Sequence, residues 1–112
     1  MKIDRQLGLF GTALRTRLLM LLVLLEESYA TELARLAGVR LSAVQKHLED
    51  FEDDGIVASR VIGRERRVAF NPRFFAKNEL AALLVKLAEQ DEDVLAAVRT
   101  LRRRPRRKGK EI

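Results

Sequence analysis

The chain of 112 residues contains no cysteine, no tryptophan and only two prolines. Without cysteine, neither a disulfide framework nor a thiolate metal site is possible. The longest apolar run, LLMLLVLL at residues 18–25, is shorter than the roughly 20 residues that a membrane-spanning helix needs. We therefore expect one domain with its own core, located in the cytoplasm.

The sequence also lacks the patterns that enzymes use. It shows no nucleophile–base pair, no glycine-rich phosphate loop and no acid dyad. Its single histidine, His47, has neither a cysteine nor a second histidine to share a metal with. We expect a protein that is not an enzyme and that needs no cofactor and no metal.

Positive charge is abundant, but it is concentrated at one end. Lysine and arginine number 22 against 16 acids, and residues 101–112, LRRRPRRKGKEI, hold seven of these cations and one acid. The first 100 residues therefore carry fifteen charges of each sign. We predict a folded domain over residues 1–101 and a basic tail over 102–112 with the composition of a disordered segment. The tail either adds nonspecific phosphate affinity or serves as a solubilising terminus.

The periodicity of apolar residues predicts helices at residues 12–26, 30–38 and 41–54, a hairpin at 56–71 and a helical segment over 73–101. A capping box would start the third helix at Ser42, but the spacing of the turn favours a start near Arg40. The acidic stretch EQDED at 89–93 interrupts the final apolar seam, so this segment is one bent helix or two with an exposed break.

Two helices joined by a turn of about four residues form a helix-turn-helix, and a following hairpin adds a wing. The predicted fold is therefore mainly α: a winged helix-turn-helix, with a two-stranded β-hairpin as its wing and a long C-terminal helix. Gly38 ends the first helix of the motif at a position that favours glycine.

The predicted helix 41–54 is amphipathic. Its apolar residues share one stripe of a helical wheel, and a small polar set lies opposite: Ser42, Gln45, Lys46 and Glu49. In a helix-turn-helix this face enters the major groove. Gln45 suits adenine, Lys46 suits guanine or a phosphate, and Ser42 and Arg40 suit phosphates. Any solvated helix shows a polar face, but the preceding ELARLAGV favours DNA recognition.

The predicted hairpin carries four arginines against one acid, Glu65: Arg60, Arg64, Arg66 and Arg67. Arginines on a wing can enter a minor groove or grip phosphates. Edge strands also carry charge to discourage aggregation. The excess of arginine over acid favours phosphate contact.

The last predicted helix has a longer apolar seam than one small domain needs, and helix 12–26 is apolar nearly all round. We predict a homodimer through the N-terminal helix and four leucines of the last helix: Leu80, Leu83, Leu84 and Leu87. Two-fold symmetry would place the two reading helices ~34 Å apart. The alternative is that the last helix folds back on its own core.

Three stretches together resemble the ArsR-like winged-helix transcriptional regulators: TRLLMLL at 16–22, ELARLAGVRLSAVQKHLEDFEDDGIV at 32–57, and the hairpin with GRERR. The similarity covers roughly residues 10–88. It implies a dimeric, repressor-type protein that binds double-stranded DNA, with these residues facing the duplex: Ser42, Ala43, Gln45, Lys46 and His47, and Arg64 and Arg66 in the wing. The cysteine motif of the metal-sensing members has no counterpart here.

A second hypothesis keeps the winged fold but assigns it another role. The domain would be an interaction module that binds RNA or protein, with the basic tail as a nonspecific polyanion tether. The neutral charge of the first 100 residues is compatible with this alternative.

Overall fold

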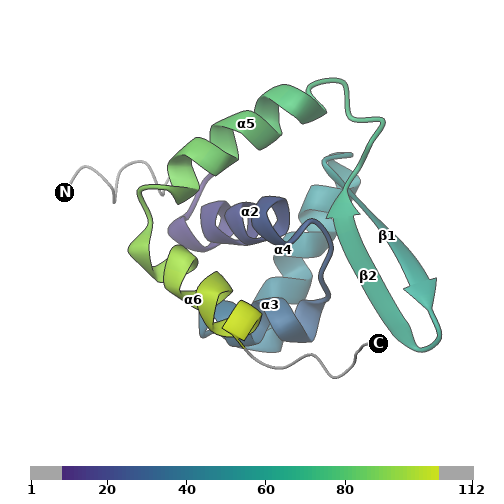
Figure 1. The fold of residues 1–112 in the computed structure, drawn as a ribbon. Helices are drawn as coiled ribbons and strands as arrows, with labels where there is room; N and C mark the ends of the chain where they lie inside the picture. Colours follow the sequence, from purple (N-terminus) through teal and green to yellow (C-terminus); the bar gives the residue numbers. More distant parts are fainter. Residues whose placement is uncertain (1–8, 104–112) are drawn as a thin grey trace.

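The computed structural model describes residues 9–103, with side chains up to residue 101. In this part, five helices and one hairpin follow in chain order: α2 (Ala13–Leu25), α3 (Ala30–Ala37), α4 (Leu41–Asp53), β1 (Val57–Ile62), β2 (Glu65–Phe70), α5 (Lys77–Ala88) and α6 (Glu92–Arg103). The predicted fold class, mainly helical with a two-stranded hairpin as a wing, is confirmed (Figure 1). Residues 104–112 of the predicted basic tail lie outside the described residues.

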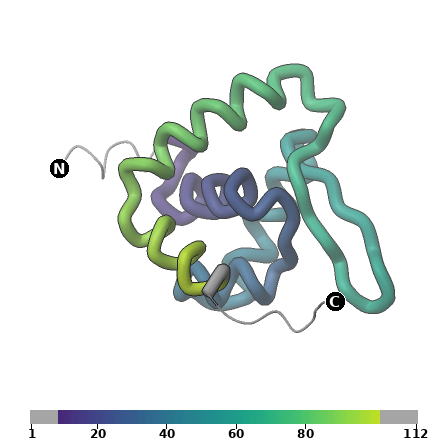
Figure 2. Tube along the Cα trace, in the orientation of Figure 1, coloured from purple at the N-terminus to yellow at the C-terminus, as the bar shows by residue number. Residues whose placement is uncertain are grey.

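Helix α2 is the centre of the core. It packs against α3, α5, α6 and β2, with α5 on one side and α3 and α6 on the other (Figures 1 and 2). Its residues 18–22 are five consecutive buried side chains, as expected for a helix covered on all sides. These residues contact their own chain, so the prediction that this apolar surface faces a second subunit is wrong for them. No helix within residues 9–103 is long and apolar enough to cross a membrane.

The turn between α3 and α4 depends on one glycine. Gly38 has φ of 71°, a left-handed conformation that L side chains rarely adopt. The following residue, Val39, donates its N–H to the Ala34 carbonyl at 3.1 Å and packs against the core. Helix α4 then begins at Leu41 with Arg40 before it, so the earlier of the two predicted starts is correct and Ser42 is not the cap.

The hairpin is attached to the body at its base. Strands β1 and β2 pair antiparallel, with Val57 opposite Phe70 and Ile62 opposite Glu65. Val57 and Val68 are buried in the core, whereas the tip is exposed. Ser28, between α2 and α3, exchanges two backbone hydrogen bonds with Val68 at 3.0 and 2.8 Å. The outer half of the hairpin therefore projects from a base that is held by the core on one side and by Ser28 on the other.

The C-terminal segment is two helices rather than the one long helix of the predicted fold. The helical conformation is interrupted between α5 and α6, next to Asp91, which is only 2% exposed. One carboxylate oxygen of Asp91 accepts the Val94 N–H at 3.1 Å, and the other accepts Arg17 Nε at 3.0 Å. The break is exposed at Glu89, Gln90, Glu92 and Asp93, but the expectation was wrong for Asp91, because this acid caps α6 and binds a cation of α2.

The leucines predicted to form a dimer interface divide between two faces of α5. Leu84 is 0% exposed and belongs to the core of its own chain, so it cannot contact a second subunit in this fold. Leu80 and Leu87 are half-buried and pack against that core. Leu83 is 42% exposed. The predicted seam is therefore mainly the inner face of α5, as the alternative reading proposed.

Candidate nucleic-acid interface

Helix α4 buries one stripe of its surface. Its buried residues Val44, Leu48 and Phe51 recur at helical spacing and join the core that α2 and α3 provide. Across the turn, α3 contributes Leu33 and Ala34 to the same core. Because α3 braces α4 on this stripe, the opposite stripe of α4 is left to solvent.

The exposed stripe contains most of the predicted reading face. Ser42, Gln45 and Lys46 are exposed, as is Arg40 before the helix, whereas Ala43 is half-buried. Among the described residues, neither the Ser42 hydroxyl nor the Gln45 amide has a hydrogen-bond partner within the chain. Lys46 has a distant contact with Asp50, at 4.0 Å. These hydrogen-bonding groups are therefore available to another molecule.

His47, which the resemblance to the ArsR-like regulators placed against the duplex, is oriented differently from this stripe. Its imidazole is half-buried, and Nδ1 lies 3.4 Å from an Arg15 guanidinium nitrogen of α2. Arg15 also donates to the Phe10 carbonyl at 2.9 Å and lies over the Phe51 ring at 4.7 Å. Partial burial, followed by the charge of Arg15, lowers the pKa of His47 below its ordinary value. His47 thus lies at the contact between α4 and α2, on the edge of the exposed stripe.

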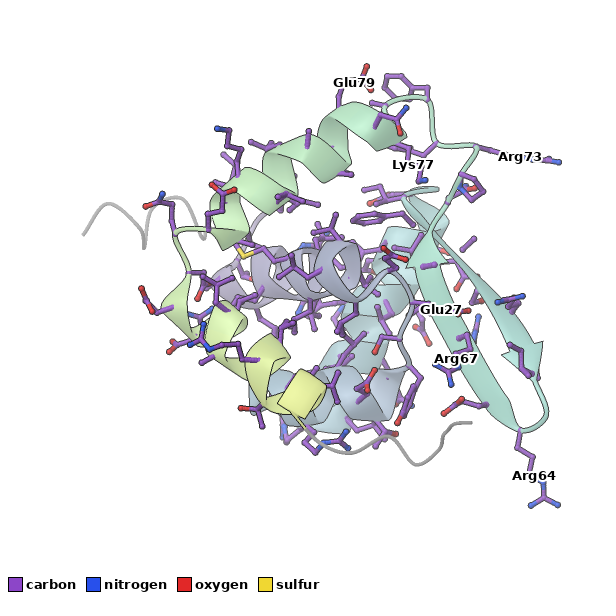
Figure 3. All side chains as sticks on the ribbon, viewed as in Figure 1. Glu27, Arg64, Arg67, Arg73, Lys77 and Glu79 are labelled. Atoms are coloured by element: carbon purple, nitrogen blue, oxygen red, sulfur yellow. The ribbon has the colours of Figure 1, made fainter. Side chains whose placement is uncertain are left out.

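The four predicted wing arginines differ in their surroundings. Arg64 lies at the tip, beside Gly63, and Figure 3 shows its side chain pointing away from the body. Within the described residues it forms no ion pair. Arg67 donates to Glu65 at 2.8 Å and lies over the Tyr29 ring at 5.1 Å. Arg64 is therefore the wing cation most open to a partner.

The other two arginines bind acids of the body on opposite faces of the hairpin. Arg60 donates through Nε and a terminal nitrogen to Glu27, at 3.2 and 3.0 Å. Arg66 donates to Glu52 of α4 at 3.0 Å and through Nε to Ser59 at 3.1 Å. The Ser59 hydroxyl in turn donates to Glu52 at 2.8 Å.

Sequence reasoning missed these acids because their distance along the chain carries no signal. Glu27 lies 33 residues before Arg60, and Glu52 lies 14 residues before Arg66. The alternation of the strands was the available clue, because it places Arg60 and Arg66 on opposite faces. It does not say which acid meets each face.

The C-terminal half of α4 is acidic, in contrast to its N-terminal half. Two of its acids are bound to cations of the chain, Asp50 to Arg15 at 3.4 Å and Glu52 to Arg66. Glu49 and Asp53 are exposed. A polyanion would therefore meet attraction at the start of α4 and repulsion towards its end.

A groove of about 730 Å³ runs between the hairpin face that carries Arg60 and Arg67, the end of α2 and the start of α5. Figure 3 shows Lys77 at the end of α5 nearest the hairpin, whereas Arg73 and Glu79 point away from the body. Its lining includes both charged and apolar residues: Glu26, Glu27, Arg60, Arg67 and Lys77, and Leu22, Val23, Ala58, Ala69 and Phe70. Arg60 and Arg67 are already paired within the chain.

Residues 9–101 contain no group of three or more histidine, aspartate or glutamate side chains that could hold a metal ion. Comparison of the chain with family models, with curated proteins and with solved structures finds no match. The resemblance to the ArsR-like regulators therefore stays a prediction from the sequence.

Proposed function

We propose that this protein is a sequence-specific regulator of transcription, of the repressor type, that binds double-stranded DNA. The observation that carries the proposal is the start of α4, where Ser42, Gln45 and Lys46 are exposed while the opposite stripe is buried against the helices behind it. A braced helix with free hydrogen-bonding groups at its N-terminal end suits the major groove. A protein of this function would act in the cytoplasm.

The charges along α4 favour one orientation on the duplex. The amide dipoles make the N-terminal end of a helix electropositive, and Arg40 and Lys46 add charge there. The acids of the C-terminal half would repel phosphates. We infer that the first turns of α4 approach the bases and that the wing reaches the flanking backbone, with Arg64 foremost.

Selection of bound sequences from a random pool of duplex DNA, at stated salt, tests this function. The full chain should enrich one motif. Gln45→Ala should relax the preference at one base pair by about 1–3 kcal/mol, because a bidentate contact to adenine is lost. Gln90→Ala is the matched control, since Gln90 is also exposed but lies between α5 and α6.

Two results would contradict the proposal. A pool that yields no motif would argue against sequence-specific binding. A motif that survives removal of Gln45 and Lys46 together would show that another surface reads the sequence.

We further propose that the protein forms a homodimer through the outer face of α5. Leu83 is exposed there, and Phe75 just before the helix is 92% exposed. Glu79 and Lys86 lie seven residues apart, so they share one face of the helix. If two copies of α5 pair antiparallel about Ala82 and Leu83, each Glu79 faces the Lys86 of the partner.

Charge exchange tests this interface. Glu79→Lys and Lys86→Glu should each weaken dimerisation, because like charges then meet across the two-fold axis. The double variant should restore it, because the pairs form again with their signs reversed. Sedimentation equilibrium of the parent chain, the two single variants and the double variant measures dimerisation. If all four proteins are monomeric, the proposed dimer is excluded.

The second candidate function is a module that binds RNA or protein. The pairing of Arg60, Arg66 and Arg67 within the chain and the exposure of Phe75 favour it. Gel shifts with genomic DNA fragments, using the full chain and a version ending at Leu101, separate the two functions. Binding that ignores sequence and disappears with the tail would support the second.

A further inference from the structure

Two carboxylates hold the wing from opposite sides. Because residues that face each other across an antiparallel pair lie on the same side of the sheet, Arg60 and Arg67 share one face and Arg66 and Ser59 lie on the other. Glu27 binds the first face from the segment after α2, and Glu52 binds the second from α4. Figure 3 shows Glu27 beside the hairpin face that carries Arg67.

These contacts use the groups that a phosphate would use. Arginine donates in a planar fork that suits carboxylates and phosphates alike. Arg60 directs two nitrogens at one oxygen of Glu27, and Arg66 divides its donors between Glu52 and Ser59. While these bonds exist, a polyanion at the wing finds both forks occupied.

Neither contact is strong enough to exclude a competitor. The side chains of Arg60 and Arg66 are 68% and 62% exposed, and those of the two acids 35% each. Exposed ion pairs of this kind change an equilibrium by about fivefold or less. A phosphate can therefore replace each carboxylate. Its affinity for the arginine is reduced by the free energy needed to break the existing ion pair.

We propose that Glu27 and Glu52 are internal competitors of phosphate, which hold Arg60 and Arg66 against the body and thereby lower the affinity of the wing for a polyanion. The proposal deepens the proposed function and rests on it where the polyanion is DNA. Its consequence is a gain of binding when an acid that does not touch the polyanion is removed. Glu52 would also make the wing sensitive to the position of α4, because it lies on α4 and binds Arg66 of the wing.

The chain supplies a matched control for each acid. Glu26 precedes Glu27 and Asp53 follows Glu52, both are exposed, and within the described residues neither is ion-paired. We call Glu26 and Glu27 one couple, and Glu52 and Asp53 the other. Within each couple, replacing either acid by alanine changes the net charge by the same amount. Only the substitution of Glu27 or Glu52 frees an arginine, so the difference within each couple isolates the competition from general repulsion.

We would compare these four alanine variants of the full chain on heparin-agarose and on duplex DNA at about 0.1 M salt. Glu52→Ala should elute at higher salt than Asp53→Ala and bind duplex DNA about two- to fivefold more tightly. Glu27→Ala should exceed Glu26→Ala in the same way. Equal behaviour within both couples would overturn the proposal.

A double-mutant cycle supplies a second, independent readout. Arg66→Ala should weaken heparin binding more in the Glu52→Ala background than in the parent chain, because only there is the arginine free. Additive effects would overturn the proposal. Heparin binding needs no DNA motif, so the two proposals can fail separately. If the selection yields no motif but the effects of the two substitutions are non-additive, only the proposed function is rejected. If a motif is selected but the effects are additive, only the competition is rejected.

Discussion

Replacement of Asp91 by alanine should destabilise the fold more than any other single loss of an acid. Asp91 is only 2% exposed and makes two contacts, one to the backbone of α6 and one to Arg17 of α2. It is the connection that fixes the break between α5 and α6. Asp93, two residues further on, also contacts Arg17 at 3.3 Å, but its side chain is 82% exposed.

The magnitude follows from the two contacts. Loss of a side-chain cap at a helix N-terminus costs about 1 kcal/mol. Loss of the contact to Arg17 adds about 1–2 kcal/mol, a value kept low because Arg17 is one-third exposed and retains Asp93. The sum is about 2–3 kcal/mol, a large part of the roughly 5–15 kcal/mol by which domains are stable.

Urea unfolding followed by circular dichroism measures this loss. Asp91→Asn should cost about 1 kcal/mol, because asparagine still caps the helix while the charge is gone. Asp93→Ala should cost less than about 0.5 kcal/mol, as expected for an exposed pair. If Asp91→Ala proved no more costly than Asp93→Ala, the buried contact with Arg17 would contribute nothing and the reasoning would fail.

Three further outcomes are expected. Because the pKa of His47 is lowered in the fold, its neutral form is favoured there. Its contribution to the free energy of unfolding should be complete above pH 6.5 and lost as pH falls through the folded pKa. The urea midpoint should therefore drop as pH falls over this range, and His47→Gln should make the drop smaller. Gly38→Ala should cost about 1–2 kcal/mol through backbone strain alone, since no atom lies within 4 Å of the added Cβ, and Gly38→Asn should cost less in the same urea assay. Phe51→Ala should cost about 3–5 kcal/mol by leaving a cavity under α4, a loss that thermal unfolding would show as a lower Tm.

Local signals in the sequence were sufficient for the helix-turn-helix and the hairpin. The apolar spacing of Val44, Leu48 and Phe51 defines the buried stripe of α4, and Gly38 marks the turn, because both depend on neighbours along the chain. The start of α4 at Leu41 was also correct, since the length of the turn limits where the helix can begin.

Contacts between distant residues were beyond such signals. Arg17 meets Asp91 across 74 positions, so one acid of a stretch predicted to be an exposed break is instead a buried cap. The seam of α5 was real, but periodicity does not say whether Leu84 faces its own core or a partner. The candidate site shows the same division: the exposed stripe of α4 was predictable, whereas the acids that occupy the wing arginines were not.

The pairing within the wing bears on where specificity would arise. A neutral body with three of its four wing arginines occupied offers little excess charge for indiscriminate binding, apart from Arg64 and the cations Arg40 and Lys46 at the start of α4. Beside these cations, the uncharged hydrogen-bonding side chains of Ser42 and Gln45 are free, and they would gain energy only where a base edge or a phosphate matches them. If the protein binds DNA as proposed, such a surface would bind weakly to most duplexes and better to a few, because competing carboxylates would reduce the contribution that every sequence shares and leave the contribution that differs between sequences intact.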